Sequence, residues 1–129
     1  MEKQKLNRYN DDWASVSCLI RVHRAKNCCE SCGIPNGLIH KRYKNGTYKQ
    51  AEYHELELID YYVVHLHYKV ATAIKKLGFK RVILTVAHID HNEKNDLSIN
   101  LICECQWCHL KRDRQDNWNR RRYGYMQRN

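Results

Sequence analysis

The stretch RVILTVAHIDHNEKNDLSINLICECQWCH, residues 81–109, decides the fold that this sequence predicts. Residues 81–86 are mostly apolar and β-branched, a composition typical of a strand. A short histidine-bearing segment ends this strand, and a polar loop, 92–98, follows it. Residues 99–102 form a second apolar run that leads into a pair of cysteines, and the polar chain beyond is expected to begin as a helix. Strands and helices in this mixture favour an α+β fold.

Two CxxC pairs are the strongest single signal in the chain: Cys29 with Cys32, and Cys105 with Cys108. Because a CxxC turn directs two thiolates toward one point, two such turns predict a tetrahedral four-sulfur site, and Zn²⁺ is the expected structural metal. Residues 33–104 separate the two pairs. We therefore expect the metal to tie the two ends of the domain together.

The other three cysteines have different expected roles. Cys28 and Cys103 lie next to the pairs and remain rival ligands, although their spacing departs from CxxC. Cys18 is expected to be a small buried apolar residue of the first helix. An odd total of seven cysteines argues against complete disulfide pairing, and thiols in a reducing cytoplasm more often bind metal. The predicted location is therefore cytoplasmic.

Three further elements are predicted upstream of the deciding stretch. Apolar residues at helical spacing indicate an N-terminal helix over 11–26. The dipeptide Asn45-Gly46 suits a two-residue type I′ turn, which predicts a hairpin over 38–50. A longer apolar stripe predicts one long middle helix over 55–77.

Length, composition and charge limit the possible classes of protein. At 129 residues, of which 43% are hydrophobic, the chain has the size of one domain and enough apolar side chains for a core. No run approaches the roughly 20 apolar residues of a membrane span, and the polar start lacks the apolar core of a signal peptide. A net charge of +9 favours a polyanionic partner, with nucleic acid the first candidate. A single domain over residues 1–129 is predicted.

Several of these features occur together in one known family. The string Asn100-Leu101-x-x-x-Cys105-x-x-Cys108-His109, the histidines after the strand and the upstream knuckle at 29–33 together resemble the HNH endonucleases. The resemblance implies a ββα-metal motif, placed here over 81–118, with structural zinc knuckles around it. A basic tail over 119–129 follows the motif.

The resemblance also implies an activity. It points to a DNA endonuclease that hydrolyses phosphodiester bonds with one divalent cation, Mg²⁺ or a similar ion. Such hydrolysis needs an activated water and a positive charge beside the phosphate, and neutral imidazole is a suitable base near pH 7. By resemblance, His88 is the general base, Asn100 the positioning residue and His109 a ligand of the catalytic cation. The implied partner is double-stranded DNA in a bacterium or a phage-infected cell, and monomer and homodimer both remain open.

Two positions depart from the family pattern. Glu104 stands where leucine is usual, and Ala87 stands where the family commonly has Asp or His as a metal ligand. Asp90 or His91 can bind the cation while His88 is the base, the assignment we favour because His88 follows the strand directly. Alternatively, Asp90 and His91 are the acid–base pair and His88 is a supporting group. A further alternative is a zinc-ribbon protein that binds nucleic acid without cutting it.

Basic residues concentrate after His109, and as a group they predict contacts with DNA phosphates. The expected nucleic-acid-binding residues are Lys111, Arg112, Arg114, Arg120, Arg121 and Arg122. Each one taken alone is equally compatible with a solvated helix. The prediction therefore rests on the group and on its place directly after the expected site.

Overall fold

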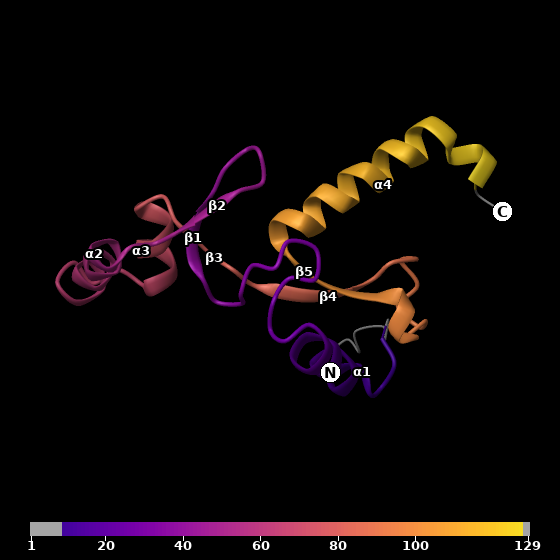
Figure 1. Ribbon diagram of the computed structural model, residues 1–129, viewed down its shortest axis with the longest axis horizontal. Helices are drawn as coiled ribbons and strands as arrows, with labels where there is room; N and C mark the ends of the chain where they lie inside the picture. Colours follow the sequence, from indigo (N-terminus) through magenta and orange to yellow (C-terminus); the bar gives the residue numbers. More distant parts are fainter. Residues whose placement is uncertain (1–8, 128–129) are drawn as a thin grey trace, which may run out of the picture. The chain divides into compact units, whose positions relative to one another are not determined.

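The computed structural model describes residues 9–127, apart from the side chains of Arg120 and of residues 122–127 (Figure 1). These residues form helices and two small antiparallel sheets, which confirms the predicted α+β class. The chain divides into two compact units: a terminal unit, residues 1–34 with 84–129, and a central unit, residues 35–83. The prediction of a single domain stays a prediction. No helix in the described part of the chain has the length and hydropathy that a membrane span requires.

The terminal unit contains two strands followed by a helix, in the order that the sequence predicts. Its elements are α1 (Trp13–Cys18), the π-helical η1 (Leu19–Arg24), β4 (Leu84–His88), the 3-10 turn η2 (Ser98–Asn100), β5 (Leu101–Cys105) and α4 (Gln106–Gln127). Strands β4 and β5 pair antiparallel, with Leu84 opposite Cys105 and His88 opposite Leu101. Since α4 starts directly after β5, the second cysteine pair joins the end of the strand to the first turn of the helix.

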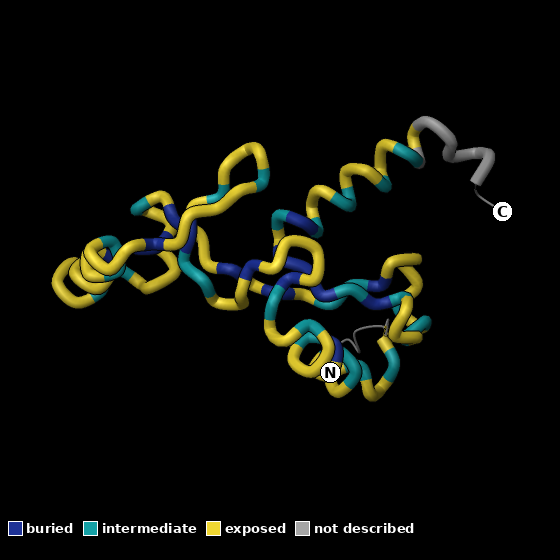
Figure 2. The backbone as a smooth tube through the Cα atoms, viewed as in Figure 1, coloured by how far each residue is buried: buried dark blue, intermediate teal, exposed yellow. Residues whose placement is uncertain are grey.

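Burial in the terminal unit concentrates on the hairpin rather than on α4 (Figure 2). Four of the five residues of β5 are buried, and β5 contacts both η1 and α4. Beyond Cys108, the described side chains of α4 are half-buried or exposed. The hairpin is therefore the core of this unit, and α4 presents most of its length to solvent.

The N-terminal helix predicted over 11–26 is present as α1 and η1. The expectation that Cys18 is buried on it is wrong, because Cys18 is exposed. The buried residue of this segment is Ile20. Two residues along a helix correspond to about 200° of rotation, so a face that buries Ile20 leaves Cys18 in solvent.

The strand predicted over 81–86 is divided between two sheets. Strand β3 (Lys80–Arg81) pairs with β1 (Ile39–Arg42) of the central unit, and β4 begins later, in the terminal unit. Between the two strands, the amide of Val82 donates to the carbonyl of Leu38 (2.9 Å), and its carbonyl accepts from the amide of Gly37 (2.9 Å). Val82 is buried and bonded to a loop, so the apolar run cannot continue as one straight strand.

The central unit packs a three-stranded sheet and two helices around a small core. Its elements are β1 (Ile39–Arg42), β2 (Tyr48–Gln50), α2 (Tyr53–Val64), α3 (Val70–Lys76) and β3, with strand order β2-β1-β3. The predicted hairpin is present, since β1 and β2 pair antiparallel. The buried core consists of Ala51, Ile59, Ala73, Ile74 and Phe79.

The turn of this hairpin differs from the two-residue type I′ turn that the sequence predicts. The strands close at Arg42 opposite Tyr48, and the amide of Gly46 donates to the carbonyl of Tyr43 (3.0 Å). Gly46 has φ +91°, whereas the φ of Asn45 is not positive. A type I′ turn needs positive φ at both central residues, so the longer loop uses only the glycine.

The single middle helix predicted over 55–77 is wrong, because the chain forms two helices, α2 and α3. Between them His67 has φ +59°, and the amide of Tyr68 donates to the carbonyl of Tyr62 (3.0 Å). Ile59 of α2 and Ile74 of α3 belong to the same core. In a continuous helix these two residues would be about 22 Å apart, so burying both requires the break.

Truncation of Ile59 tests the packing of the central unit. The side chain is 4% exposed within the core, so Ile59→Ala is expected to cost about 2–5 kcal/mol of unfolding free energy. Its neighbour Leu58 is 46% exposed on the same helix, and Leu58→Ala is expected to cost less than about 1 kcal/mol. Denaturant unfolding followed by circular dichroism measures both, and equal losses would contradict this core.

Candidate functional site

The four cysteines of the two CxxC pairs converge in the terminal unit. Their sulfur atoms all lie within 4.8 Å of one another, and the Sγ atoms of Cys32 and Cys105 are 3.8 Å apart. Cys29, Cys105 and Cys108 are buried, whereas Cys32 is exposed. Four sulfurs at this spacing are the donor set of a structural Zn²⁺ site. The predicted convergence is confirmed: the group can hold a metal.

The first knuckle is built by a tight turn. Gly33, with φ +82°, donates its amide to the carbonyl of Cys29 (2.8 Å), and the amide of Cys32 donates to the Sγ of Cys29 (3.4 Å). A left-handed residue at position 33 favours glycine, because a side chain is disfavoured at that φ. The CxxCG sequence therefore closes the turn through bonds within residues 29–33.

The knuckle is tied to β5 through Glu30. The amide of Glu30 donates to the carbonyl of Cys103 (2.8 Å), and its carboxylate accepts from the amide of Cys103 (2.8 Å). Arg24 holds the same carboxylate through Nε (2.9 Å) and Nη2 (2.7 Å). The Arg24 hydrogen bond is the main cause that lowers the pKa of Glu30. These bonds bring the two cysteine pairs together.

The rival ligands lie outside the group of four. Neither Cys28 nor Cys103 belongs to the cluster of converging sulfurs. Cys103 is fully buried in β5, and burial raises the pKa of its thiol to about 11. Burial also raises the pKa of Cys105 and Cys108, and a bound cation supplies the charge that thiolates need there.

A second group of possible metal ligands lies at the start of α2, where sequence analysis found none. Glu52, His54 and Glu55 offer donor atoms within 4.8 Å of one another, and all are exposed or half-buried. Glu52 and Glu55 form a reciprocal capping box with the backbone, an arrangement that satisfies the free amides of a helix start. Helix capping accounts for this cluster.

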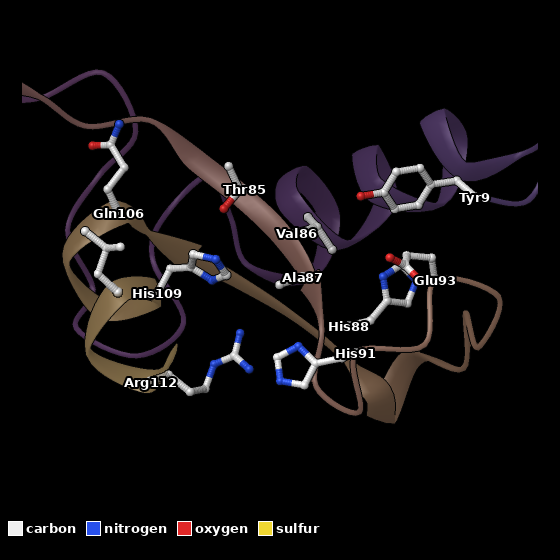
Figure 3. Close-up of a pocket in the computed structure, with 11 residues that line it drawn as sticks. Tyr9, Thr85, Val86, Ala87, His88, His91, Glu93, Gln106, His109 and Arg112 are labelled. Atoms are coloured by element: carbon white, nitrogen blue, oxygen red, sulfur yellow. The ribbon is translucent and has the colours of Figure 1, made fainter. Parts of the chain in front are cut away.

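The second candidate site is a pocket of about 470 Å³ in the terminal unit. It is bordered by β4, the loop that follows β4 and the start of α4 (Figure 3). His88, His91 and His109 all line it, together with Ala87 and Arg112. The three histidines that the sequence singled out therefore border one pocket.

His88 is the least accessible of the three histidines. Its side chain is 4% exposed, and its ring stacks on Trp13 (4.6 Å between centroids) and Tyr9 (5.9 Å). The Nε2 atom lies 2.8 Å from Oδ1 of Asp96, and this hydrogen bond lowers the pKa of Asp96. Ring stacking and the carboxylate fix His88 in place.

His91 and His109 are more accessible, and each faces a carboxylate of α4. His91 is 53% exposed, with Nε2 3.2 Å from Oδ2 of Asp116. His109 is 34% exposed, with Nε2 3.2 Å from Oδ2 of Asp113, four residues further along the helix. The Nδ1 atom of His109 is buried and has no hydrogen-bond partner among the described residues. This orphaned nitrogen is available to a ligand or a cation.

Asp90 and Asn100 brace the loop between the two strands. Asp90 accepts hydrogen bonds from Asn95 (2.9 Å), from the amide of Asn92 (2.8 Å) and from Asn100 (2.9 Å), which together lower its pKa. Asn100 also accepts from the amide of Asp90 (3.1 Å) and donates to the carbonyl of Asn95 (2.8 Å). Neither residue lines the histidine pocket. The structure thus brings Asp90 to Asn100, whereas His109, with which Asp90 was expected to share a cation, borders the pocket.

Sequence reasoning missed the carboxylates that partner the histidines: Asp96, Asp113 and Asp116. A usable signal was present for Asp113, because an Asp four residues after a histidine faces it on a helix. Asp96 and Asp116 are paired through the fold, eight and 25 residues from their histidines, and no spacing rule finds them.

The basic residues expected to bind nucleic acid do not all have the same surroundings. Lys111 is exposed and lies over the ring of Trp107 (5.2 Å to the centroid), and Arg114 and Arg121 are exposed. Arg112 is half-buried and pairs with Glu104. The side chains of Arg120 and Arg122 lie outside the described residues.

Comparison of the chain with models of protein families, with curated proteins and with solved structures finds no match. The residues and their geometry are therefore the basis on which a function is assigned.

Proposed function

We propose that the chain is a metal-dependent DNA endonuclease of the HNH kind, with its active site in the histidine pocket. The observation that carries the proposal is the convergence of His88, His91 and His109 on one pocket beside a strand–strand–helix unit. Each of the three rings has a carboxylate within hydrogen-bonding distance. Carboxylate–imidazole pairs of this type orient the imidazoles of bases and of metal ligands.

The residues that remain available fit a divalent cation. His109 offers a buried, unpartnered Nδ1 among the described residues, and Asp113 lies at Nε2 on the other side of the same ring, where it orients the imidazole. His109, through Nδ1, is the proposed ligand, with Asp113 as its orienting carboxylate, in place of the pairing of Asp90 with His109. When bound, the cation supplies positive charge for the phosphate and for the leaving oxygen. The four-cysteine group is the separate, structural metal site.

His91 fits the role of general base better than His88. His91 is half exposed at the pocket, and its Nε2 lies against Asp116. In neutral imidazole, a proton on Nε2 leaves the lone pair on Nδ1 free to accept a proton. His88, enclosed by two aromatic rings and Asp96, is the support of the site. This assignment agrees with the alternative in which His91 belongs to the acid–base pair and His88 is a supporting group.

The proposed reaction is hydrolysis of the bond between phosphorus and the 3′ oxygen. A water oxygen attacks phosphorus, its proton passes to Nδ1 of His91, and the 3′ oxygen leaves and takes a proton from solvent. The products carry a 5′-phosphate and a 3′-hydroxyl group. Asn100 acts as a positioning residue, because its bonds to Asp90 and Asn95 hold the loop that presents His91.

Double-stranded DNA is the proposed partner. The chain carries a net charge of +9, and Lys111, Arg114 and Arg121 are exposed along α4, the helix that borders the pocket. Cationic side chains along one helix can follow a phosphate backbone. The rival function is that of a zinc-ribbon protein that binds DNA without cutting it. The positive charge of the chain supports this function equally well, and the two differ only in whether the phosphodiester bond is hydrolysed.

Plasmid nicking tests the proposal. Protein that retains its zinc but no other divalent cation is expected to bind supercoiled plasmid without cutting it, and added Mg²⁺ or Mn²⁺ is expected to start conversion to open circles. His109→Ala is expected to reduce the rate by at least about tenfold, since loss of an oriented ligand weakens metal sites by that order. The matched control is His54→Ala, which removes an exposed histidine of the central unit.

Binding without metal-dependent cutting would favour the zinc-ribbon alternative. Equal nicking rates for His109→Ala and His54→Ala would show that the histidine pocket takes no part in the reaction.

A further inference from the structure

Glu104 is a charged residue that the fold buries. It lies in β5 and is 2% exposed. One carboxylate oxygen accepts from the hydroxyl of Ser31 (2.8 Å), and the other accepts from Nε of Arg112 (2.8 Å). Burying a carboxylate is costly unless it is paired. Ser31 and Arg112 supply this pairing, and the buried carboxylate in turn holds the Arg112 guanidinium in one position.

The pairing leaves the outer edge of the Arg112 guanidinium without partners. Glu104 is bonded to Nε, on the inner edge. Both terminal nitrogens, Nη1 and Nη2, are buried and have no hydrogen-bond partner among the described residues. A guanidinium has five N–H donors, so four donors of a permanent cation remain unsatisfied. Such groups are rare in folded proteins, and water or a bound anion can satisfy them.

The unsatisfied edge lies at the histidine pocket. Arg112 lines the pocket with His91 and His109, and Figure 3 shows its guanidinium on the side where these two rings lie. On α4, residues 109, 112, 113 and 116 follow at the spacing of one helix face. The carboxylates of this face, Asp113 and Asp116, are each paired with a histidine. Among the described residues that line the pocket itself, Glu93 is the one acid.

A second hollow also borders Arg112 but suits an anion less well. It is lined by Cys32 and Cys108 of the four-cysteine group and by Lys111. Thiolates of a metal-bound site would repel an anion that approached from there. The histidine pocket is therefore the side from which an anion reaches Arg112.

We infer that Arg112 is the phosphate-binding residue of the pocket and that Glu104 is the positioning residue that orients it. Nη1 and Nη2 donate to two non-bridging oxygens of one phosphodiester, the planar geometry for which arginine is suited. Glu104 fixes the guanidinium from behind, so no side-chain freedom is lost when the phosphate binds. The inference rests on the proposed function for its substrate, DNA, but it concerns binding and not cutting.

Binding of a fluorescein-labelled DNA duplex, followed by anisotropy without added divalent cation, tests the inference apart from catalysis. Arg112→Gln is expected to weaken binding by about tenfold to a hundredfold, because a bidentate charge-assisted contact is lost. Arg81→Gln removes the same charge from an exposed position of the central unit and is expected to weaken binding by less than about threefold. Arg112→Lys keeps the charge but loses the planar guanidinium with its two Nη donors, so its loss of DNA affinity should resemble that of Arg112→Gln.

The DNA affinity of Glu104→Gln shows whether Glu104 orients Arg112 or acts only through its charge, because the two roles predict changes in opposite directions. Removing a negative charge from a DNA-binding protein should tighten binding if only net charge matters. If Glu104 orients Arg112, binding should weaken by about threefold or more, at a temperature where the melting curve shows a folded protein. Unchanged or tighter binding by Glu104→Gln, or equal losses for Arg112→Gln and Arg81→Gln, would overturn the inference.

The outcomes also separate this inference from the proposed nuclease. Arg112-dependent binding without any cutting leaves the phosphate site intact and contradicts the nuclease. Metal-dependent cutting at the same rate in Arg112→Gln and Arg81→Gln supports the nuclease and contradicts the phosphate site.

Discussion

Cys108→Ser is expected to unfold the terminal unit and to strip its metal. Structural zinc binds to small peptides with apparent free energies of about 10–16 kcal/mol, whereas a whole domain is stable by only about 5–15 kcal/mol. Cys108 joins the first turn of α4 to the knuckle that holds Cys29. Losing one of four ligands therefore weakens an interaction whose free energy is as large as the stability of a whole domain. Elemental analysis and circular dichroism measure the two effects, and wild-type protein should carry about one zinc per chain.

Two other cysteines supply the controls. Cys18 is exposed and outside the group, so Cys18→Ser should change stability by no more than about 0.5 kcal/mol. Cys103 is buried but also outside the group, so Cys103→Ala should cost stability yet keep the zinc. If Cys103→Ala lost the metal and Cys108→Ser kept it, the ligand assignment would be wrong. Protein that stays folded after complete removal of zinc would show that the metal does not hold the unit together.

The metal site was predictable because its geometry is local. A CxxC turn ended by Gly33 brings two sulfurs together whatever the rest of the chain does, and the same holds for Cys105 and Cys108. The sequence could not show which contacts join the two knuckles. Glu30 makes that connection through the backbone of Cys103. A glutamate between two cysteines is usually exposed to solvent, so the sequence did not indicate this contact.

The break in the middle helix was not predictable from periodicity. The apolar stripe over 55–77 fits one helix as well as two, since both α2 and α3 bury apolar residues from it. What decides is the core, where Ile59 and Ile74 meet. His67 in a left-handed conformation is the consequence, and histidine carries no strong turn signal of the kind that glycine does.

Strand alternation could not predict which of the two histidines, His88 or His91, is enclosed and which is accessible. Alternation places every second residue on one face, but β4 ends at His88, and His91 has φ +60°. The amide of His91 donates to the carbonyl of His88 (3.1 Å), which makes a turn of the segment. Which ring is enclosed depends on Trp13 and Tyr9, far away in the sequence, and no local pattern contains that information.

His91→Ala is expected to lower the rate of metal-dependent nicking by about 10²–10⁴-fold, the range that a positioned general base contributes. Because His91 is 53% exposed, the variant should melt within a few degrees of the wild type. The removed ring leaves an opening at the surface beside Asp116, so free imidazole should restore part of the rate. Such rescue is a signature of a missing base and does not occur when a variant is merely unstable.

His88→Ala is the matched comparison, with the opposite distribution of effects. It removes the stack on Trp13 and Tyr9 and the hydrogen bond to Asp96, which should cost at least about 2 kcal/mol of stability. Well below its melting temperature it should retain more activity than His91→Ala, and imidazole should not raise that activity, because the site of the lost ring is enclosed by the aromatic residues. If instead His88→Ala is folded, inactive and rescued by imidazole while His91→Ala cuts normally, then the base is the histidine at the end of β4. Asp96 would in that case be its orienting carboxylate, and Asp116 would have no part in the chemistry.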